Sequence, residues 1–184
     1  VKGLDSNVII VSAHYDGLGV GPEGTLYPGA NDNASGVAAM LEMARVLKAS
    51  PSQTKKTILF VAWSGGERQE GFSVTYAMRA KRGFDLLTVE AVIELSGVGA
   101  GSGTGIALGP GTSFSLVQLF QDAASRIGVP VTTRGRGPHF GLDSLAGFGG
   151  RSALSAYVSW DGSAQTAHTA ADTPEAIDLD KLKQ

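Results

Sequence analysis

Compact apolar runs alternate along this chain with segments whose apolar residues recur at helical spacing. Residues 7–13, 57–63 and 89–95 are rich in aliphatic side chains and are bounded by polar or glycine-containing sequence. Runs of this length and content are typical of strands that are buried on both faces of a sheet. Residues 33–47, between the first two runs, have the apolar spacing of an amphipathic helix. The alternation predicts an α/β fold in three layers, in which helices cover both faces of a mainly parallel or mixed sheet.

The rest of the chain continues this pattern and contains no recognisable interdomain linker. Its length of 184 residues fits one domain with its own core, so we expect a single domain over residues 1–184. Residues 17–32 are rich in Gly and Pro and are expected to form a loop. Further helices are expected over residues 74–82, 113–127 and 174–183, and further strands over residues 129–133 and 153–158.

Composition narrows the function classes. The formal net charge is −2, so the sequence does not predict nucleic-acid binding. Arg134 and Arg136 lie in a Thr-Arg-Gly-Arg-Gly stretch, which is more typical of a solvated loop than of a phosphate site. The absence of cysteine excludes disulfides and thiolate metal ligands. No apolar run approaches the roughly 20 residues that a membrane-spanning helix needs.

Polar residues with metal-binding side chains follow the predicted strands. His14 and Asp16 come directly after the first strand, Asp32 precedes the first helix, Glu67 follows the second strand, and His168 lies near the C-terminus. In sheets of this kind, ligands bind beyond the carboxyl ends of the strands, so these side chains are expected to converge. Carboxylates combined with imidazoles suit zinc or a similar divalent ion, and a carboxylate between two ligand sets can bridge two ions.

Each of these residues also has a purely structural interpretation. A histidine after a strand is more often hydrogen-bonded than metal-bound, and an aspartate before a helix is usually a cap. Asp16 could form only a salt link with His14, or could orient its imidazole. The metal hypothesis therefore depends on the combination of ligands from several strand ends.

The stretches VIIVSAHYDGLG, YPGANDNASGVAAMLEMARVLK and KTILFVAWSG resemble the double-zinc aminopeptidases, the group of the bacterial leucyl aminopeptidases and glutamate carboxypeptidase-like enzymes. The closing HTAADTPEAIDLDKL also matches that family's usual ending. Relatives in the family include single-zinc glutaminyl cyclases and the non-catalytic transferrin receptor ectodomain. The resemblance implies an extracytoplasmic or secreted protein. Relative to the family, the chain is expected to lack an N-terminal helix and strand. Because it begins at Val1 rather than Met, we expect a fragment or a processed product.

The resemblance also implies roles for the five polar residues. His14 would bind the first metal, and Asp32 would bridge both metals. Glu67 and His168 would complete the second site. Asp16 would orient His14.

Three positions depart from the family pattern at places that carry chemistry. The family has two adjacent glutamates after WSG, a general base followed by a ligand, and here the ungapped match puts Gly66 at the base and Glu67 at the ligand. Ser96 stands where the family has the aspartate that completes the first metal site. Ala167 stands where many family enzymes have an aromatic residue that helps to stabilise the oxyanion. A neutral serine is a much poorer ligand than a carboxylate.

Two further residues are candidates near the site. Glu94 lies two residues before Ser96 and therefore points to the same face of the strand, so it could serve as a substitute ligand, although a solvated or salt-bridged role is the alternative. Asp143 weakly matches the family's loop near the substrate, and with Ala167 it is placed at the substrate rim. An ordinary surface loop explains Asp143 equally well.

These residues together predict a zinc-aminopeptidase-like domain whose peptidase activity is impaired or absent. One divalent ion or none is expected, held by Asp32, Glu67 and His168, and two ions only if Glu94 compensates for Ser96. The main alternative is an active metallo-aminopeptidase that releases N-terminal residues from peptides, and a glutaminyl-cyclase-like enzyme ranks last. The expected partner in either peptidase case is a peptide or protein N-terminus. The sequence does not predict an oligomeric state.

Overall fold

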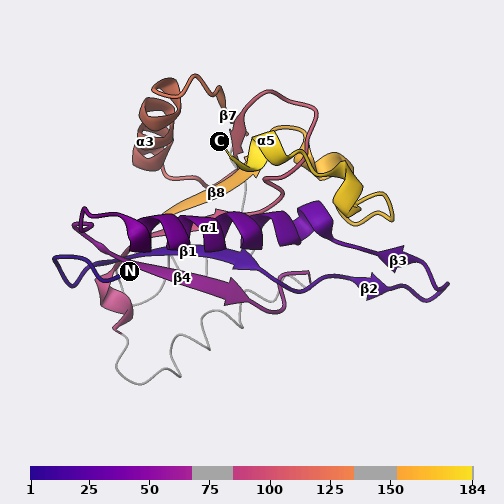
Figure 1. Ribbon diagram of the computed structural model, residues 1–184, viewed down its shortest axis with the longest axis horizontal. Helices are drawn as coiled ribbons and strands as arrows, with labels where there is room; N and C mark the ends of the chain where they lie inside the picture. Colours follow the sequence, from indigo (N-terminus) through magenta and orange to yellow (C-terminus); the bar gives the residue numbers. More distant parts are fainter. Residues whose placement is uncertain (68–84, 135–152, 184) are drawn as a thin grey trace.

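The computed structural model describes residues 1–67, 85–134 and 153–183, and within these ranges the main element is a six-stranded sheet (Figure 1). Every neighbouring pair in the sheet is parallel except β6 and β8, which are antiparallel. The predicted α/β fold with a mainly parallel or mixed sheet is confirmed. The strands, in their order across the sheet, are β4 (Thr57–Trp63), β1 (Val8–His14), β5 (Val89–Leu95), β8 (Leu154–Trp160), β6 (Ile106–Leu108) and β7 (Val131–Thr133).

The remaining described elements lie around this sheet. A small antiparallel hairpin extends beyond the end of β1, as Figure 1 shows, and a π-helical turn leads from it into the first α-helix. The C-terminal part of the chain forms short helical turns. These elements are β2 (Gly19–Val20), β3 (Leu26–Tyr27), η1 (Ala30–Ser35), α1 (Gly36–Ala49), η2 (Leu86–Thr88), α3 (Phe114–Ser125), η4 (Ser163–Gln165), η5 (Pro174–Ala176) and α5 (Leu179–Leu182).

The core divides into two clusters, one on each face of the sheet. On one face, Met40 of α1 and Leu116 of α3 pack with strand residues such as Leu95 and Leu108, so these two helices cover that face. The cluster on the other face consists mainly of strand residues and includes Ile10. The helix predicted over residues 74–82 lies outside the described residues.

Two elements were missed by the sequence analysis. Ile106–Leu108 forms β6, which is only three residues long and depends on long-range pairing with β8. Gly105, directly before it, lies so close to Pro130 that an added Cβ would fall 2.1 Å from the Pro130 carbonyl oxygen. The hairpin of β2 and β3 lies within residues 17–32, which were predicted to be a loop, and its strands are two residues each. Such short strands leave no detectable periodicity.

The start of α1 is tied to the end of β5 by Asn33. Its side-chain oxygen accepts hydrogen bonds from Gly36 N (3.2 Å) and Gly97 N (3.2 Å), and its amide nitrogen donates to Leu95 O (2.9 Å). Asn33 therefore caps the start of α1, whereas the hydroxyl of Ser35 donates to Asn31 O. This arrangement brings the turn before α1 against the carboxyl end of the central strands.

The two-sided core predicts a contrast between two leucines. Leu108→Ala should lower the free energy of unfolding by about 3 kcal/mol, because Leu108 is fully buried against α3 and its truncation leaves a cavity. Leu119→Ala is the matched control, since Leu119 lies on α3 and is 60% exposed. Urea unfolding measures both, and an equal loss in the two variants would contradict this description of the core.

Candidate metal centre

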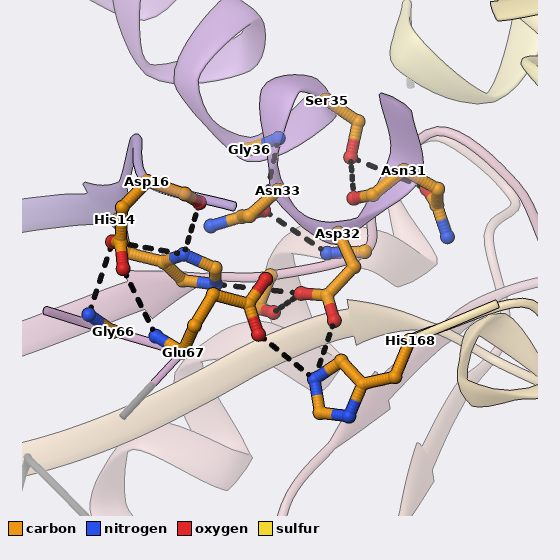
Figure 2. A network of polar contacts seen from close by, with 12 residues as sticks. His14, Asp16, Asn31, Asp32, Asn33, Ser35, Gly36, Gly66, Glu67 and His168 are labelled. Atoms are coloured by element: carbon orange, nitrogen blue, oxygen red, sulfur yellow. Dashed lines mark hydrogen bonds and ion pairs between the residues drawn. The ribbon is translucent and has the colours of Figure 1, made fainter. Parts of the chain in front are cut away.

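Polar side chains from distant parts of the sequence meet beyond the carboxyl ends of β1, β4 and β5 (Figure 2). His14 is the last residue of β1, Ser96 directly follows β5, and Glu67 lies in the turn after β4. Asp32 comes from the π-helical turn before α1, and His168 comes from the C-terminal segment.

The carboxylate of Asp32 lies between the two imidazoles, with one oxygen facing each. Its Oδ1 is 3.3 Å from His14 Nε2, and its Oδ2 is 3.3 Å from His168 Nε2. His168 Nε2 also lies 3.0 Å from Glu67 Oε2. Figure 2 shows the three side chains of Asp32, Glu67 and His168 pointing at one centre.

Asp32, Glu67 and His168 fit a divalent ion. Each offers one ligand atom, and these atoms lie within 4.8 Å of one another. Two carboxylates and one imidazole form a donor set that zinc accepts, with a fourth position left for water or substrate. The Asp32 and Glu67 side chains are only 12% and 6% exposed, whereas the His168 side chain is 61% exposed. The centre is therefore walled by carboxylates on one side and open to solvent on the other.

The titration properties of the two carboxyls differ. Burial raises the pKa of Glu67, and the neighbouring Asp32 carboxylate raises it further. Burial also opposes ionisation of Asp32, but the hydrogen bond and charge of His14, together with His168, outweigh it and lower the pKa of Asp32. Asp32 is thus held as the anion at the middle of the cluster, where a cation would gain most from it.

The position predicted for a first metal holds a hydrogen-bonded group of side chains. Ser96 Oγ donates to Asp32 Oδ1 at 3.5 Å, on the same oxygen that faces His14. Burial lowers the pKa of His14, but the hydrogen bond to Asp32 and the surrounding carboxylates raise it by more, so the net shift is upward. Glu94, the predicted substitute ligand, is partly buried, and it is not part of the cluster of metal-ligating atoms found among the described residues.

Asp16 holds the turn that carries Glu67. Its Oδ1 accepts a hydrogen bond from Gly66 N at 3.0 Å, and its Oδ2 accepts one from Glu67 N at 3.2 Å. His14 Nδ1 lies 3.3 Å from the backbone oxygen of Asp16 and 3.6 Å from Oδ1. Asp16 therefore contacts both the predicted first ligand and the backbone of the Glu67 ligand, as Figure 2 shows.

Gly66, at the predicted general-base position, lies against the side chain of His14. A Cβ added to Gly66 would fall 2.4 Å from both Cβ and Cγ of His14. Real Cβ atoms essentially never approach so closely, so any larger residue at this position requires the His14 ring or the turn to move. In this conformation the missing carboxylate does not leave an empty space.

Asp172 is the functional residue that the sequence analysis missed. Its side chain is almost fully buried and accepts hydrogen bonds from Asn31 N at 2.6 Å and from Asp32 N at 2.9 Å. The peptide bond between Asp32 and Asn33 is cis, and His168 has a left-handed backbone with φ 59°. A left-handed non-glycine residue is uncommon and often marks a functional site. Asp172 lies four residues after His168, within the quoted closing stretch, and that spacing was the available signal.

Two residues were predicted to lie at the substrate rim. Ala167 lines a cavity beside Asp32 whose volume is about 140 Å³. Asp143 lies outside the described residues.

Within the described ranges, no helix has the length and apolar content needed to cross a membrane.

The comparisons with known proteins agree on one family. The model of peptidase family M28 matches residues 1–184. Aminopeptidase YwaD of Bacillus subtilis (strain 168) is 48% identical over 61 residues, which are 33% of this chain and 12% of that protein. The solved zinc aminopeptidase BSAP from Bacillus subtilis is 27% identical with a TM-score of 0.75, and the match covers 100% of this chain and 45% of BSAP. The chain thus spans less than half of that enzyme.

A glutaminyl cyclase shares the same fold. The solved enzyme from an Acidobacteriales bacterium has a TM-score of 0.76 and covers 99% of this chain, which spans 66% of it. Sequence identity to this cyclase is 21%, so the likeness extends to the fold alone.

Asp172 gives a prediction that links stability to the centre. Asp172→Asn should lower the free energy of unfolding by about 2 kcal/mol, because an amide offers one acceptor oxygen where two buried N–H groups need acceptors. Thermal unfolding measures the loss, and Asp180→Asn serves as the exposed control. An Asp172→Asn variant as stable as the unmodified protein would contradict the positioning role.

Glu94 gives a prediction about pH. Burial raises the pKa of Glu94 to about 7, from an ordinary value of 4.5. The unfolded chain therefore loses this proton at lower pH than the folded protein, so the buried carboxyl costs stability as pH rises from about 4.5 to 7. Between pH 4.5 and pH 8, the free energy of unfolding of the unmodified protein should fall through this group by on the order of 2 kcal/mol. Glu94→Gln should lack this fall, because a glutamine side chain does not titrate. Chemical denaturation of the metal-free proteins across this range measures the difference, and parallel pH profiles would contradict it.

Proposed function

Because the chain belongs to peptidase family M28, we propose that it is a zinc-aminopeptidase-like domain that holds one divalent ion and has impaired or absent peptidase activity. The observation that carries this proposal is the convergence of Asp32, Glu67 and His168 on one centre. An ion held there supplies a Lewis acid for the carbonyl of a peptide bond. The expected ligand is the N-terminal part of a peptide or protein.

The first metal position supports a count of one ion. His14 and Asp32 remain at this position, but the third group is the neutral hydroxyl of Ser96, which is hydrogen-bonded to Asp32. Burial raises the pKa of Glu94 to about 7, so this carboxyl is only partly ionised at neutral pH and is a weaker anionic ligand than an ordinary glutamate. We therefore propose that Glu94 does not compensate and that only the second position is filled.

Two positions of the site, Gly66 and Ala167, lack the side chains that assist peptide hydrolysis in the family. Peptide hydrolysis needs a base that accepts a proton from the attacking water and an acid that returns it to the leaving amine. Gly66 has no side chain that could accept or return a proton. The absence of a general base typically lowers the rate by roughly 10²–10⁴. Ala167 has no group that could donate a hydrogen bond to a developing oxyanion. Removal of one such donor from other enzymes lowers the rate by roughly 10²–10³. These residues support a slow or inactive site.

Zinc titration followed by calorimetry and metal analysis tests the ion. The unmodified protein should bind one zinc ion per chain. Asp16→Ala removes a residue that supports the ligands and should weaken zinc binding by roughly 10–100-fold. Glu67→Gln and His168→Ala remove ligands and should weaken it by more than that. Asp122→Asn is the control, since Asp122 is exposed on α3 and distant in sequence from the ligands. Two tightly bound ions, or none, would contradict the proposed stoichiometry.

Turnover of leucine p-nitroanilide tests the proposed impairment. The unmodified protein should be at least about 100-fold slower than the Bacillus subtilis zinc aminopeptidase assayed beside it. Ser96→Asp should add a second zinc ion but restore little activity, because no base is present at Gly66. Gly66→Glu should also restore little, because its Cβ collides with His14. Rapid turnover by the unmodified protein that a chelator abolishes would establish the alternative, an active aminopeptidase.

A further inference from the structure

A second cavity opens beside the metal centre and shares Asp32 with it. Its volume is about 140 Å³. Asp32 and Ser96, which are hydrogen-bonded to each other, both line this cavity. A residue whose carbonyl reaches the metal centre could therefore place its side chain in this cavity. The lining consists of Asn31, Asp32, Ser96, Gly97, Arg134, Tyr157, Ser159, Ser163, Ala164 and Ala167.

The cavity contains a buried hydroxyl with no protein partner. Ser163 is 8% exposed and lines the cavity, and within the described part of the chain its side chain makes no hydrogen bond. Buried hydroxyls are nearly always hydrogen-bonded to protein or water, so an unpaired one in a cavity wall is available to a polar ligand that enters the cavity. Gly97, which faces it, has φ 65°, and a Cβ there would fall 3.1 Å from Ser163 Oγ. The glycine thus keeps this hydroxyl accessible.

Two further residues of the lining, Arg134 and Tyr157, carry hydrogen-bond donors. Arg134 donates one hydrogen bond, from Nη2 to Asp161 Oδ1 at 3.1 Å, and 43% of its side-chain surface is exposed, so other N–H groups of the guanidinium remain for a ligand. Tyr157 shares a side-chain hydrogen bond with Ser96, and burial raises the pKa of its hydroxyl to about 12, so it keeps its proton at neutral pH. Among the described residues of the lining, Asp32 is the only one with a carboxylate, and Asp161, which contacts Arg134, lies outside this lining.

We propose that this cavity binds the side-chain carboxylate of an acidic residue, aspartate or glutamate, at the N-terminus of the peptide whose carbonyl faces the metal centre. Arg134 supplies the positive charge, and Ser163 supplies a hydroxyl donor. This inference rests on the proposed function and names its substrate class. An aliphatic side chain of similar size would leave the Ser163 hydroxyl without a partner and would make no use of the Arg134 N–H groups that do not bond to Asp161, and sites built for hydrogen bonding reject such ligands strongly.

The test uses the zinc-loaded protein and three small probes, the α-hydroxamates of aspartate, asparagine and leucine, with affinity measured by calorimetry. The aspartate probe should bind about tenfold tighter than the other two, as expected for hydrogen bonds to a charged group. Arg134→Gln should remove most of this preference while leaving zinc affinity unchanged. Ser163→Ala should weaken the aspartate probe several-fold. Arg45→Gln is the matched control, because Arg45 pairs with Glu42 on the exposed side of α1.

Equal or tighter binding of the leucine probe, or an Arg134→Gln variant with the same preference, would overturn the proposal. Zinc content is measured first, so that a failure of the metal centre is recognised separately. If no zinc binds, the same variants are titrated with free L-aspartate and L-leucine. Aspartate binding that depends on Arg134 then still supports the cavity, and binding that is absent or independent of Arg134 overturns it.

Discussion

The buried carboxylate of Asp172 determines where the centre can form. Because it accepts hydrogen bonds from the N–H groups of Asn31 and Asp32, it fixes the turn before α1 against the C-terminal segment. His168 lies on that same segment, so one contact sets both the bridging carboxylate and its imidazole partner. Asn33 then ties the turn to the end of β5. Without these contacts the residues at 32 and 168 would have no fixed separation.

Much of the fold could be predicted from the sequence, because its long strands have strong local signals. The apolar runs at residues 57–63 and 89–95 match β4 and β5 in full. β6 was missed because its pairing with β8 is a long-range property that three residues cannot encode locally. The helix predicted over residues 74–82 lies outside the described residues and stays a prediction.

The candidate site was predictable in its ligands but not in its supporting contacts. Residue type and position indicated five polar residues, and the resemblance to a known family assigned Asp32, Glu67 and His168 to one metal position, where the structure brings them together. The contact of Asp16 with the backbone of Glu67, and the close approach of Gly66 to His14, depend on how two turns pack. From the sequence alone, Gly66 is only a substitution for a glutamate. In the structure, the His14 side chain packs against this glycine where a Cβ would otherwise lie.

The three converging ligands come from widely separated parts of the chain. Asp32 precedes the first helix, Glu67 follows the second strand in the central sheet, and His168 lies in the closing segment. An ion bound by all three would act as a cross-link between these parts, and it would bind the folded chain in preference to the unfolded one. Such an ion would therefore stabilise the fold as well as polarise a ligand, and the free energy of unfolding would rise with the supply of metal.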